Sequence, residues 1–288
     1  MQIETGDKDY YTVNMSGYLD KILDNNRINM RHTSYPAGPE LTESNETDEL
    51  LPLKEQERFH SEVAKVLFIA KRVRMSVLTA VSVLASRVNK ATVKDRAKLD
   101  KIFGYLSKSR EMVMKYKCGG NVEPFAYADA SWATEADMHG RTGVVLTLAG
   151  CAIGAWSYRQ KMVTKDSTEA ELVALSDAVS EILWMRHLLL AQGYNIGPTT
   201  LYQDNQAVID LMRSERRTKQ RTKHLNVRYF HARDLELSGQ IKIQWKSTHL
   251  MLADLMTKPL QSTSFTNLTM LLTGNASVVN GEVVAKSV

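Results

Sequence analysis

The chain has 288 residues, of which 43% are hydrophobic and 24% are charged, an ordinary composition for a globular protein with one large or two modest domains. Its formal net charge of +5 indicates a polyanionic partner only weakly, because many globular proteins are mildly basic. Cys118 and Cys151 stand in no zinc-ligand spacing, which argues against a metal knuckle and a disulfide framework. No apolar run approaches the ~20 residues of a membrane span, and the N-terminus lacks a secretory pattern, so we expect a cytoplasmic or nuclear protein.

The first part of the chain divides at residue 52. Residues 1–52 are polar and lack apolar periodicity, which predicts an extended lead-in or linker. Over residues 53–117, apolar side chains recur at spacings of three and four, which predicts a small subdomain of about three helices. Gly119 and Gly120 interrupt this pattern, so we place a domain boundary near residue 118.

Residues 118–262 have the mixed periodicity of an α/β fold. The predicted strands cover 125–132, 142–148, 151–158, 199–203 and 241–245. The predicted helices cover 167–191, 204–211, 223–237 and the run LMLADLMTKPL, which Pro259 closes. The order βββαβααβα predicts a mixed five-stranded sheet flanked by helices. Residues 263–288 are expected to form a loosely ordered tail.

Two acidic residues occupy strand positions in this predicted sheet. Asp129 lies within FAYADASW, where a buried carboxylate needs a partner charge or a metal to offset its lost hydration. Asp204 ends the strand TTLYQ at its junction with a helix. Each also has a purely structural interpretation, because Asp129 could lie at a strand end near solvent and Asp-Asn is a common helix cap or turn element.

Other acidic residues begin predicted helices. Thr168 and Glu171 fit a capping box, and Glu171 also lies beside the apolar stripe, from which it could project toward the sheet. Glu169 is nearly as well placed, so spacing leaves the choice between the two glutamates open. Asp254 begins an apolar helix, where the helix dipole favours an acid. Converging carboxylates repel one another unless cations lie between them, and such hard oxygen ligands favour Mg²⁺ or Mn²⁺.

Five runs of sequence carry a resemblance to a known family: YADASWA, KDSTEAELVALSDAVSEILWMRHLL, YQDNQAV, RTKHLNVRYFHARD and ADLMTKPL. In this order, over residues 120–262, they resemble the ribonuclease H domain of copia-type retrotransposon polyproteins. The stretch from ERFHSEVAKV to KIFGYLSKS is similar to the segment that joins the reverse transcriptase to that nuclease. The resemblance therefore covers roughly four-fifths of the chain.

The resemblance implies a function and a set of site residues. It favours Glu171 over Glu169 and assigns catalytic and metal-binding roles to Asp129, Glu171, Asp204 and Asp254. The implied reaction is hydrolysis of the RNA strand of RNA–DNA hybrids during reverse transcription, with two Mg²⁺ ions, or Mn²⁺, about 4 Å apart. The implied partner is the polymerase part of a reverse transcriptase. His249 is a candidate for assisting proton transfer or product release, with an exposed loop residue as the alternative.

Positive charge gathers close in sequence to these acids. Between Arg213 and Arg233 the chain has eight Lys or Arg residues and one acid, Glu215. We expect salt-sensitive contacts to the nucleic-acid backbone, with a solvated helical face as the alternative. The residues expected to make them are Arg213, Arg216, Arg217, Lys219, Arg221, Lys223 and His224. Apolar neighbours indicate a core position for the tryptophans Trp132, Trp156, Trp184 and Trp245.

The chain departs from the family pattern in two places. The family usually has Thr-Arg-Pro-Asp after the first helix, whereas this chain has Arg72-Val73-Arg74-Met75, which predicts different packing of the helical subdomain. No tyrosine is followed shortly by paired aspartates, so we expect no polymerase activity. The alternatives to a nuclease are a catalytically inactive, domesticated nucleic-acid-binding or interaction scaffold, and a structural subdomain of a polymerase on another chain. The presence of all four acids favours the nuclease.

Overall fold

The computed structural model describes residues 1–5, 9–24, 31–43, 47–119, 122–134, 137–214 and 223–286, the side chains of 223–226 excepted. The chain divides into two compact units, Met1–Cys118 with Lys258–Val288, and Gly119–Thr257. In these described parts, none of the helices combines the length and the apolar character that crossing a membrane requires.

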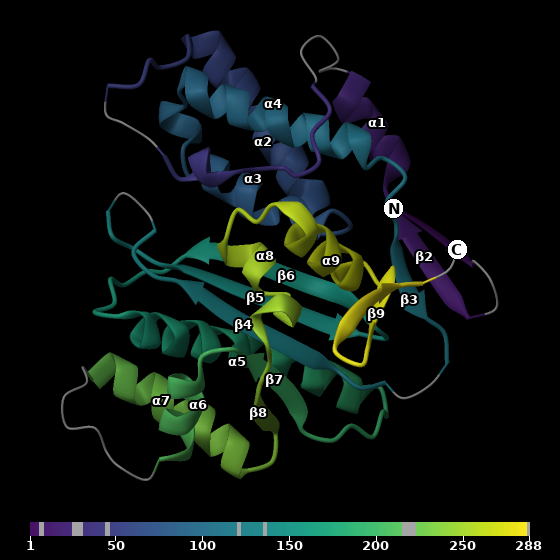
Figure 1. Ribbon diagram of the computed structural model, residues 1–288, viewed down its shortest axis with the longest axis vertical. Helices are drawn as coiled ribbons and strands as arrows, with labels where there is room; N and C mark the ends of the chain where they lie inside the picture. Colours follow the sequence, from purple (N-terminus) through teal and green to yellow (C-terminus); the bar gives the residue numbers. More distant parts are fainter. Residues whose placement is uncertain are drawn as a thin grey trace. The chain divides into compact units, whose positions relative to one another are not determined.

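The second unit is built on a mixed sheet, visible in Figure 1. Its described strands are β4 (Phe125–Ser131), β5 (Arg141–Leu148), β6 (Cys151–Arg159), β7 (Thr199–Gln203) and β8 (Ile241–Trp245). They lie in the order β6-β5-β4-β7-β8. β5 pairs antiparallel with both β4 and β6, and β7 pairs parallel with both β4 and β8. Ala149 and Gly150 have φ angles of 53° and 74°, the pattern of a type I′ turn between β5 and β6.

Helices supply the crossovers that parallel strand pairing requires. Those of the second unit are α5 (Ser167–Ala191), α6 (Gln206–Arg213), α7 (Lys223–Leu237) and α8 (Asp254–Thr257), with a 3₁₀ turn, η5, at Thr248–Leu250. Leu172, Leu175 and Val179 of α5 are buried in one core cluster with Ala126 and Ala128 of β4. Because side chains alternate across a strand, Tyr127 and Asp129, which alternate with these alanines in β4, face the opposite side of the sheet.

The predicted fold class is confirmed, because the five strands appear in the predicted order with the predicted mixed pairing. The terminal helix is shorter than predicted. Only Asp254–Thr257 is α-helical within LMLADLMTKPL, and the 3₁₀ turn at Thr248–Leu250 precedes it. Thr257 Oγ1 also lies 3.4 Å from the carbonyl oxygen of Asp254 in the same short helix.

The first unit contains the predicted helical region. Its main helices are α2 (Leu53–Ala70), α3 (Leu78–Ala85) and α4 (Val93–Lys108), with 3₁₀ turns at Pro39–Leu41, Met75–Val77 and Val88–Lys90. A capping box of Thr92 and Asp95 begins α4. In the run that departs from the family pattern, Arg74 is buried and donates to the carbonyl oxygens of Ser109 at 2.8 Å and Met112 at 3.2 Å, just beyond α4.

The structure corrects the expected lead-in and tail. Residues 1–52 include β1 (Gln2–Thr5), β2 (Tyr10–Asn14) and α1 (Ser16–Asp24), and β2 pairs with β3 (Met114–Lys117). The expected tail contains α9 (Ser262–Leu272) and the hairpin of β9 (Ala276–Val279) and β10 (Glu282–Ala285). Both segments belong to the first unit, where Leu19, Ile22 and Phe265 are buried. β2 and β3 pair across about a hundred residues of sequence, which local periodicity cannot reveal, whereas β1–β2 and β9–β10 are local pairs that the sequence analysis missed.

Candidate metal centre

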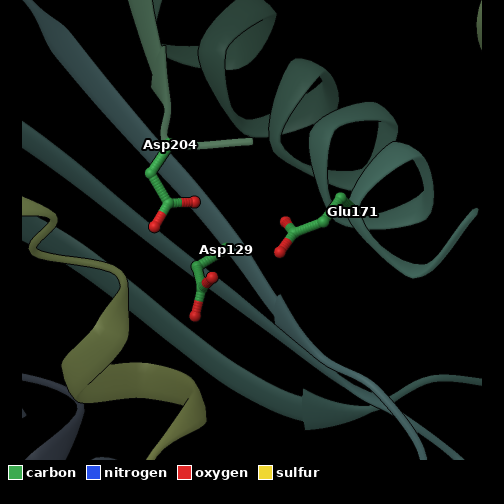
Figure 2. A group of neighbouring side chains, drawn as sticks. All are labelled: Asp129, Glu171 and Asp204. Atoms are coloured by element: carbon green, nitrogen blue, oxygen red, sulfur yellow. The ribbon is translucent and has the colours of Figure 1, made fainter. Parts of the chain in front are cut away.

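The carboxylates of Asp129, Glu171 and Asp204 meet at one end of the sheet, as Figure 2 shows. Each offers an oxygen, and these atoms all lie within 4.8 Å of one another. Asp129 belongs to β4, Glu171 to the first turns of α5, and Asp204 directly follows β7. Asp129 and Glu171 are buried, whereas Asp204 is half-buried. Such a set of hard oxygen donors can hold a divalent cation.

The choice between the two glutamates of α5 follows from how the helix begins. The N-cap is Asp166, whose side chain accepts from the backbone N–H of Glu169 at 2.9 Å. The Glu169 carboxylate accepts from the backbone N–H of Lys165 at 3.0 Å. The predicted capping box of Thr168 and Glu171 is therefore wrong, because the helix begins earlier. Glu169 supports the helix start, and Glu171 lies on the side that meets the sheet.

The partner of Asp129 across the β4–β5 pair is a glycine, and a short helix packs closely against it. Gly143 lies directly opposite Asp129 in the strand register. A Cβ atom on Gly143 would lie 2.7 Å from Thr257 Cγ2 and 2.8 Å from the carbonyl oxygen of Ala253. The missing side chain therefore lets α8 pack closely on β5, next to Asp129.

Each carboxylate accepts a hydrogen bond from a neutral side chain on another element. Thr257 Oγ1 of α8 donates to Asp129 Oδ2. Gln203 Nε2 of β7 donates to Glu171 Oε2 at 3.2 Å. Thr248 Oγ1 of η5 donates to Asp204 Oδ2 at 3.0 Å. Sequence reasoning missed these three donors. The only signals were that Gln203 directly precedes Asp204 and that Thr257 lies within the run ADLMTKPL.

Asp254 lies outside the group of three carboxylates that the structure brings together in its described residues. It is buried at the first position of α8, and it is Thr257, at the other end of that short helix, that contacts Asp129. The structure therefore groups three of the four predicted acids, and the metal-binding role of Asp254, on an adjoining element, stays a prediction.

The other predicted site residues are His249 and the basic residues from Arg213 to His224, and the structure describes only some of them. His249 is exposed on η5, with Nδ1 2.7 Å from Ser247 Oγ, and its neighbour Thr248 contacts Asp204. Arg213 is exposed at the end of α6. Arg216, Arg217, Lys219 and Arg221 lie outside the described residues, as do the side chains of Lys223 and His224.

Three of the four tryptophans are exposed rather than in the core, which corrects the prediction. Trp132, Trp184 and Trp245 expose 48%, 59% and 55% of their surface, while Trp156 is half-buried against the core. Two of the exposed indoles are anchored by their N–H groups. Trp132 donates to the carbonyl oxygen of Thr164 and Trp245 to that of Asp204, both at 3.1 Å. The apolar sequence neighbours of these tryptophans were a poor guide to burial. Trp132 directly follows β4 and Trp245 is the last residue of β8, so both lie at the ends of the sheet's strands rather than in their buried centres.

Aromatic side chains line the same face of the sheet as Asp129. The ring centroids of Tyr127 and Tyr202 are 5.1 Å apart, and Lys246 Nζ lies 4.2 Å from the centroid of Tyr202. Burial raises the pKa of Tyr127, with the neighbouring Tyr202 adding to the effect, and burial also raises the pKa of Tyr202. Both phenols are therefore even less prone than an ordinary tyrosine to lose their proton.

Comparison with solved structures gives matches at low sequence identity. Ribonuclease H1 of Halobacterium salinarum is 19% identical, with 48% of this chain and 95% of that chain covered and a TM-score of 0.34. The foamy viral protease-reverse transcriptase in complex with an RNA/DNA hybrid is 14% identical, with 86% and 29% covered and a TM-score of 0.45. No family model matches the chain.

Curated relatives match at higher sequence identity than these solved structures. The retrovirus-related Pol polyprotein from transposon RE1 of Arabidopsis thaliana is 32% identical over 196 residues, or 67% of this chain. The corresponding polyprotein from transposon TNT 1-94 of Nicotiana tabacum is 26% identical over 258 residues, or 86% of this chain. The chain spans only 13% and 19% of the length of these relatives. The matches and the fold together confirm that this chain carries a ribonuclease H-like domain related to the Pol polyproteins of copia-type retrotransposons.

Proposed function

We propose that this chain hydrolyses the RNA strand of RNA–DNA hybrids in a metal-dependent reaction that belongs to retrotransposon reverse transcription. The observation that carries the proposal is the convergence of Asp129, Glu171 and Asp204 within 4.8 Å on a ribonuclease H-like fold. The relation to transposon Pol polyproteins supports the substrate class. The polymerase part of a reverse transcriptase is the partner that we propose for it.

The donor set fits Mg²⁺, with Mn²⁺ as a substitute, because every ligand is a carboxylate oxygen. Asp129, Glu171 and Asp204 would hold the cations, and we keep Asp254 as a fourth, outlying carboxylate. Two bound divalent ions activate a water and stabilise the leaving 3′ oxygen in phosphodiester hydrolysis. The protein holds the acids in place beforehand, because Thr257, Gln203 and Thr248 each orient one carboxylate. His249, exposed beside Thr248, would assist proton transfer or product release.

The direct test incubates the full chain with Mg²⁺ and a hybrid whose RNA strand is labelled. We expect the wild type to cleave the RNA strand and Asp204→Asn to be slower by roughly 10²–10³-fold, since metal catalysis contributes several kcal/mol. Glu169→Gln is the control, because it removes a carboxylate that lies on the helix of Glu171 but outside the group. Asp254→Asn should cost less than Asp204→Asn. No cleavage by the wild type, or equal cleavage by Asp204→Asn, would overturn the proposal.

A second test concerns the basic segment, from Arg213 to His224, as the contact to the nucleic-acid backbone. We expect the double variant Arg216→Gln, Arg217→Gln to weaken hybrid binding and to reduce the slope of log affinity against log salt by about one per lost phosphate contact. Fluorescence anisotropy in Ca²⁺ at several salt concentrations measures both. Lys71→Gln, an exposed residue of the first unit, is the control. An unchanged slope in the double variant contradicts this assignment. Salt-sensitive binding without any cleavage would favour the inactive scaffold instead.

A further inference from the structure

Gln203 is a fully buried amide that lies between two of the three acids. It is the last residue of β7 and has 0% exposure. Its Nε2 donates to Glu171 Oε2 at 3.2 Å, which ties β7 to α5. Its Oε1 accepts from the backbone N–H of Asp204 at 2.8 Å and from that of Asn205 at 3.2 Å. One side chain therefore holds the carboxylate of Glu171 and the backbone that carries Asp204.

The turn after β7 is held from both sides. On one side Gln203 binds the N–H groups of Asp204 and Asn205. On the other side Asn205 is the N-cap of α6, and its Oδ1 accepts from the N–H groups of Ala207 at 3.0 Å and Val208 at 3.4 Å. The backbone of Asp204 thus has little freedom, and its side chain leaves the turn in a defined direction.

The chemistry of an amide suits this place. A lysine or arginine beside Glu171 would neutralise the carboxylate and compete with a bound cation. The neutral amide of Gln203 donates a single hydrogen bond and leaves the negative charge in place. A donor of this kind orients a metal-binding carboxylate before the metal arrives, as outer hydrogen-bond partners do in metal sites.

We propose that Gln203 is a positioning residue that couples Glu171 to Asp204 and thereby sets the affinity of the site for divalent cations. It touches neither substrate nor reacting atoms in this role. The inference rests on the metal site of the proposed function, but not on which nucleic acid is cleaved.

The test is a titration of the full chain with Mn²⁺ alone, without nucleic acid, followed by electron paramagnetic resonance of the free ion. Gln203→Met keeps the volume and removes the hydrogen bonds, and we expect it to lower Mn²⁺ affinity 10- to 100-fold. Gln160→Met is the matched control. Gln160 is also buried, at 2% exposure, but its Nε2 donates to Ala170 O at 3.0 Å and Thr142 Oγ1 at 3.2 Å rather than to a carboxylate. Equal affinity of Gln203→Met and the wild type would overturn the proposal.

A double-mutant cycle separates positioning from general damage. If Gln203 acts through Glu171, then Gln203→Met should lower Mn²⁺ affinity far less in a Glu171→Gln background than in the wild type. Additive losses would contradict this route. If circular dichroism shows that Gln203→Met does not fold, the proposal is tested instead in the wild type, by following the side-chain amide resonance of Gln203 in nuclear magnetic resonance spectra. We expect Mg²⁺ to shift it, and an unmoved resonance at saturating Mg²⁺ overturns the proposal.

The two proposals fail in different ways. Wild-type protein that binds Mn²⁺, loses this binding in Gln203→Met and cleaves no hybrid would support the positioning role and refute the proposed nuclease. If the wild-type protein cleaves the hybrid and Gln203→Met binds Mn²⁺ as tightly as the wild type, the nuclease proposal is supported and the positioning role of Gln203 is refuted.

Discussion

At the residue scale, the acids of this site are held by neutral donors that come from three different elements. Thr257 contributes from α8, Gln203 from β7 and Thr248 from η5. A hydroxyl or amide donor orients a carboxylate without cancelling its charge, so the acids remain able to attract a cation. The residues that hold the acids are therefore as much a part of the site as the acids themselves.

Thr257 allows this idea to be tested with isosteric variants. Thr257→Val keeps the shape but removes the hydroxyl that donates to Asp129, whereas Thr257→Ser keeps the donor. We expect the valine variant to bind Mn²⁺ roughly 10-fold more weakly and the serine variant to stay near the wild type, as measured by calorimetric titration. A serine variant as weak as the valine variant would show that packing, rather than the hydrogen bond, is what matters.

At the element scale, the close packing of α8 on β5 brings Thr257 to Asp129. The approach depends on Gly143, because a Cβ there would meet the backbone oxygen of Ala253 at 2.8 Å. Ser157 Oγ of β6 also donates to the carbonyl oxygen of Met256 at 2.6 Å, which anchors the same helix. This four-residue helix thus has its position set by the sheet rather than by its own helical propensity.

Gly143→Ala should push α8 away from β5. We expect it to lower the free energy of unfolding by about 1–3 kcal/mol, as overpacking of a filled site does, and to weaken Mn²⁺ binding through Thr257. Urea denaturation measures the stability change. Gly197→Ala is the control, because nothing lies within 4 Å of a Cβ there, and it should stay within about 0.5 kcal/mol of the wild type. Equal stability of both variants would contradict the packing argument.

At the scale of the whole molecule, the site lies entirely within one of the two compact units. Asp129, Glu171, Asp204 and their three donors all belong to Gly119–Thr257. The first unit is assembled from both ends of the chain, since residues 1–118 and 258–288 fold together. A cation that binds this site should therefore stabilise the second unit in particular.

Hydrogen exchange with mass spectrometry can localise this stabilisation. At Mg²⁺ near 100 times its Kd, binding stabilises the folded state by about 2.7 kcal/mol. We expect slower exchange in peptides from residues 119–257, little change in peptides from residues 1–118, and no change in either set for Asp129→Asn. Equal protection of both units by Mg²⁺ in the wild type would contradict a single site in the second unit.

The sequence by itself was enough to predict the fold class and to select most of the acids of the candidate site. Strand alternation and helical periodicity are local signals, so the five strands and α5 could be read from them. Neither spacing nor periodicity separated Glu169 from Glu171; the resemblance to the copia-type family did. The motifs also indicated Asp129, which lies within β4, and Asp204, which directly follows β7.

Only the tertiary structure decided what lies beside those acids. It placed Asp254 outside the group and assigned the helix cap to Asp166. It paired β2 with β3 across about a hundred residues of sequence, and it put Thr257 of α8 against Asp129 of β4. These are contacts between residues far apart in the chain. Local patterns record which residues can form an element but not which distant element it meets, so the orienting donors could be found only in the folded protein.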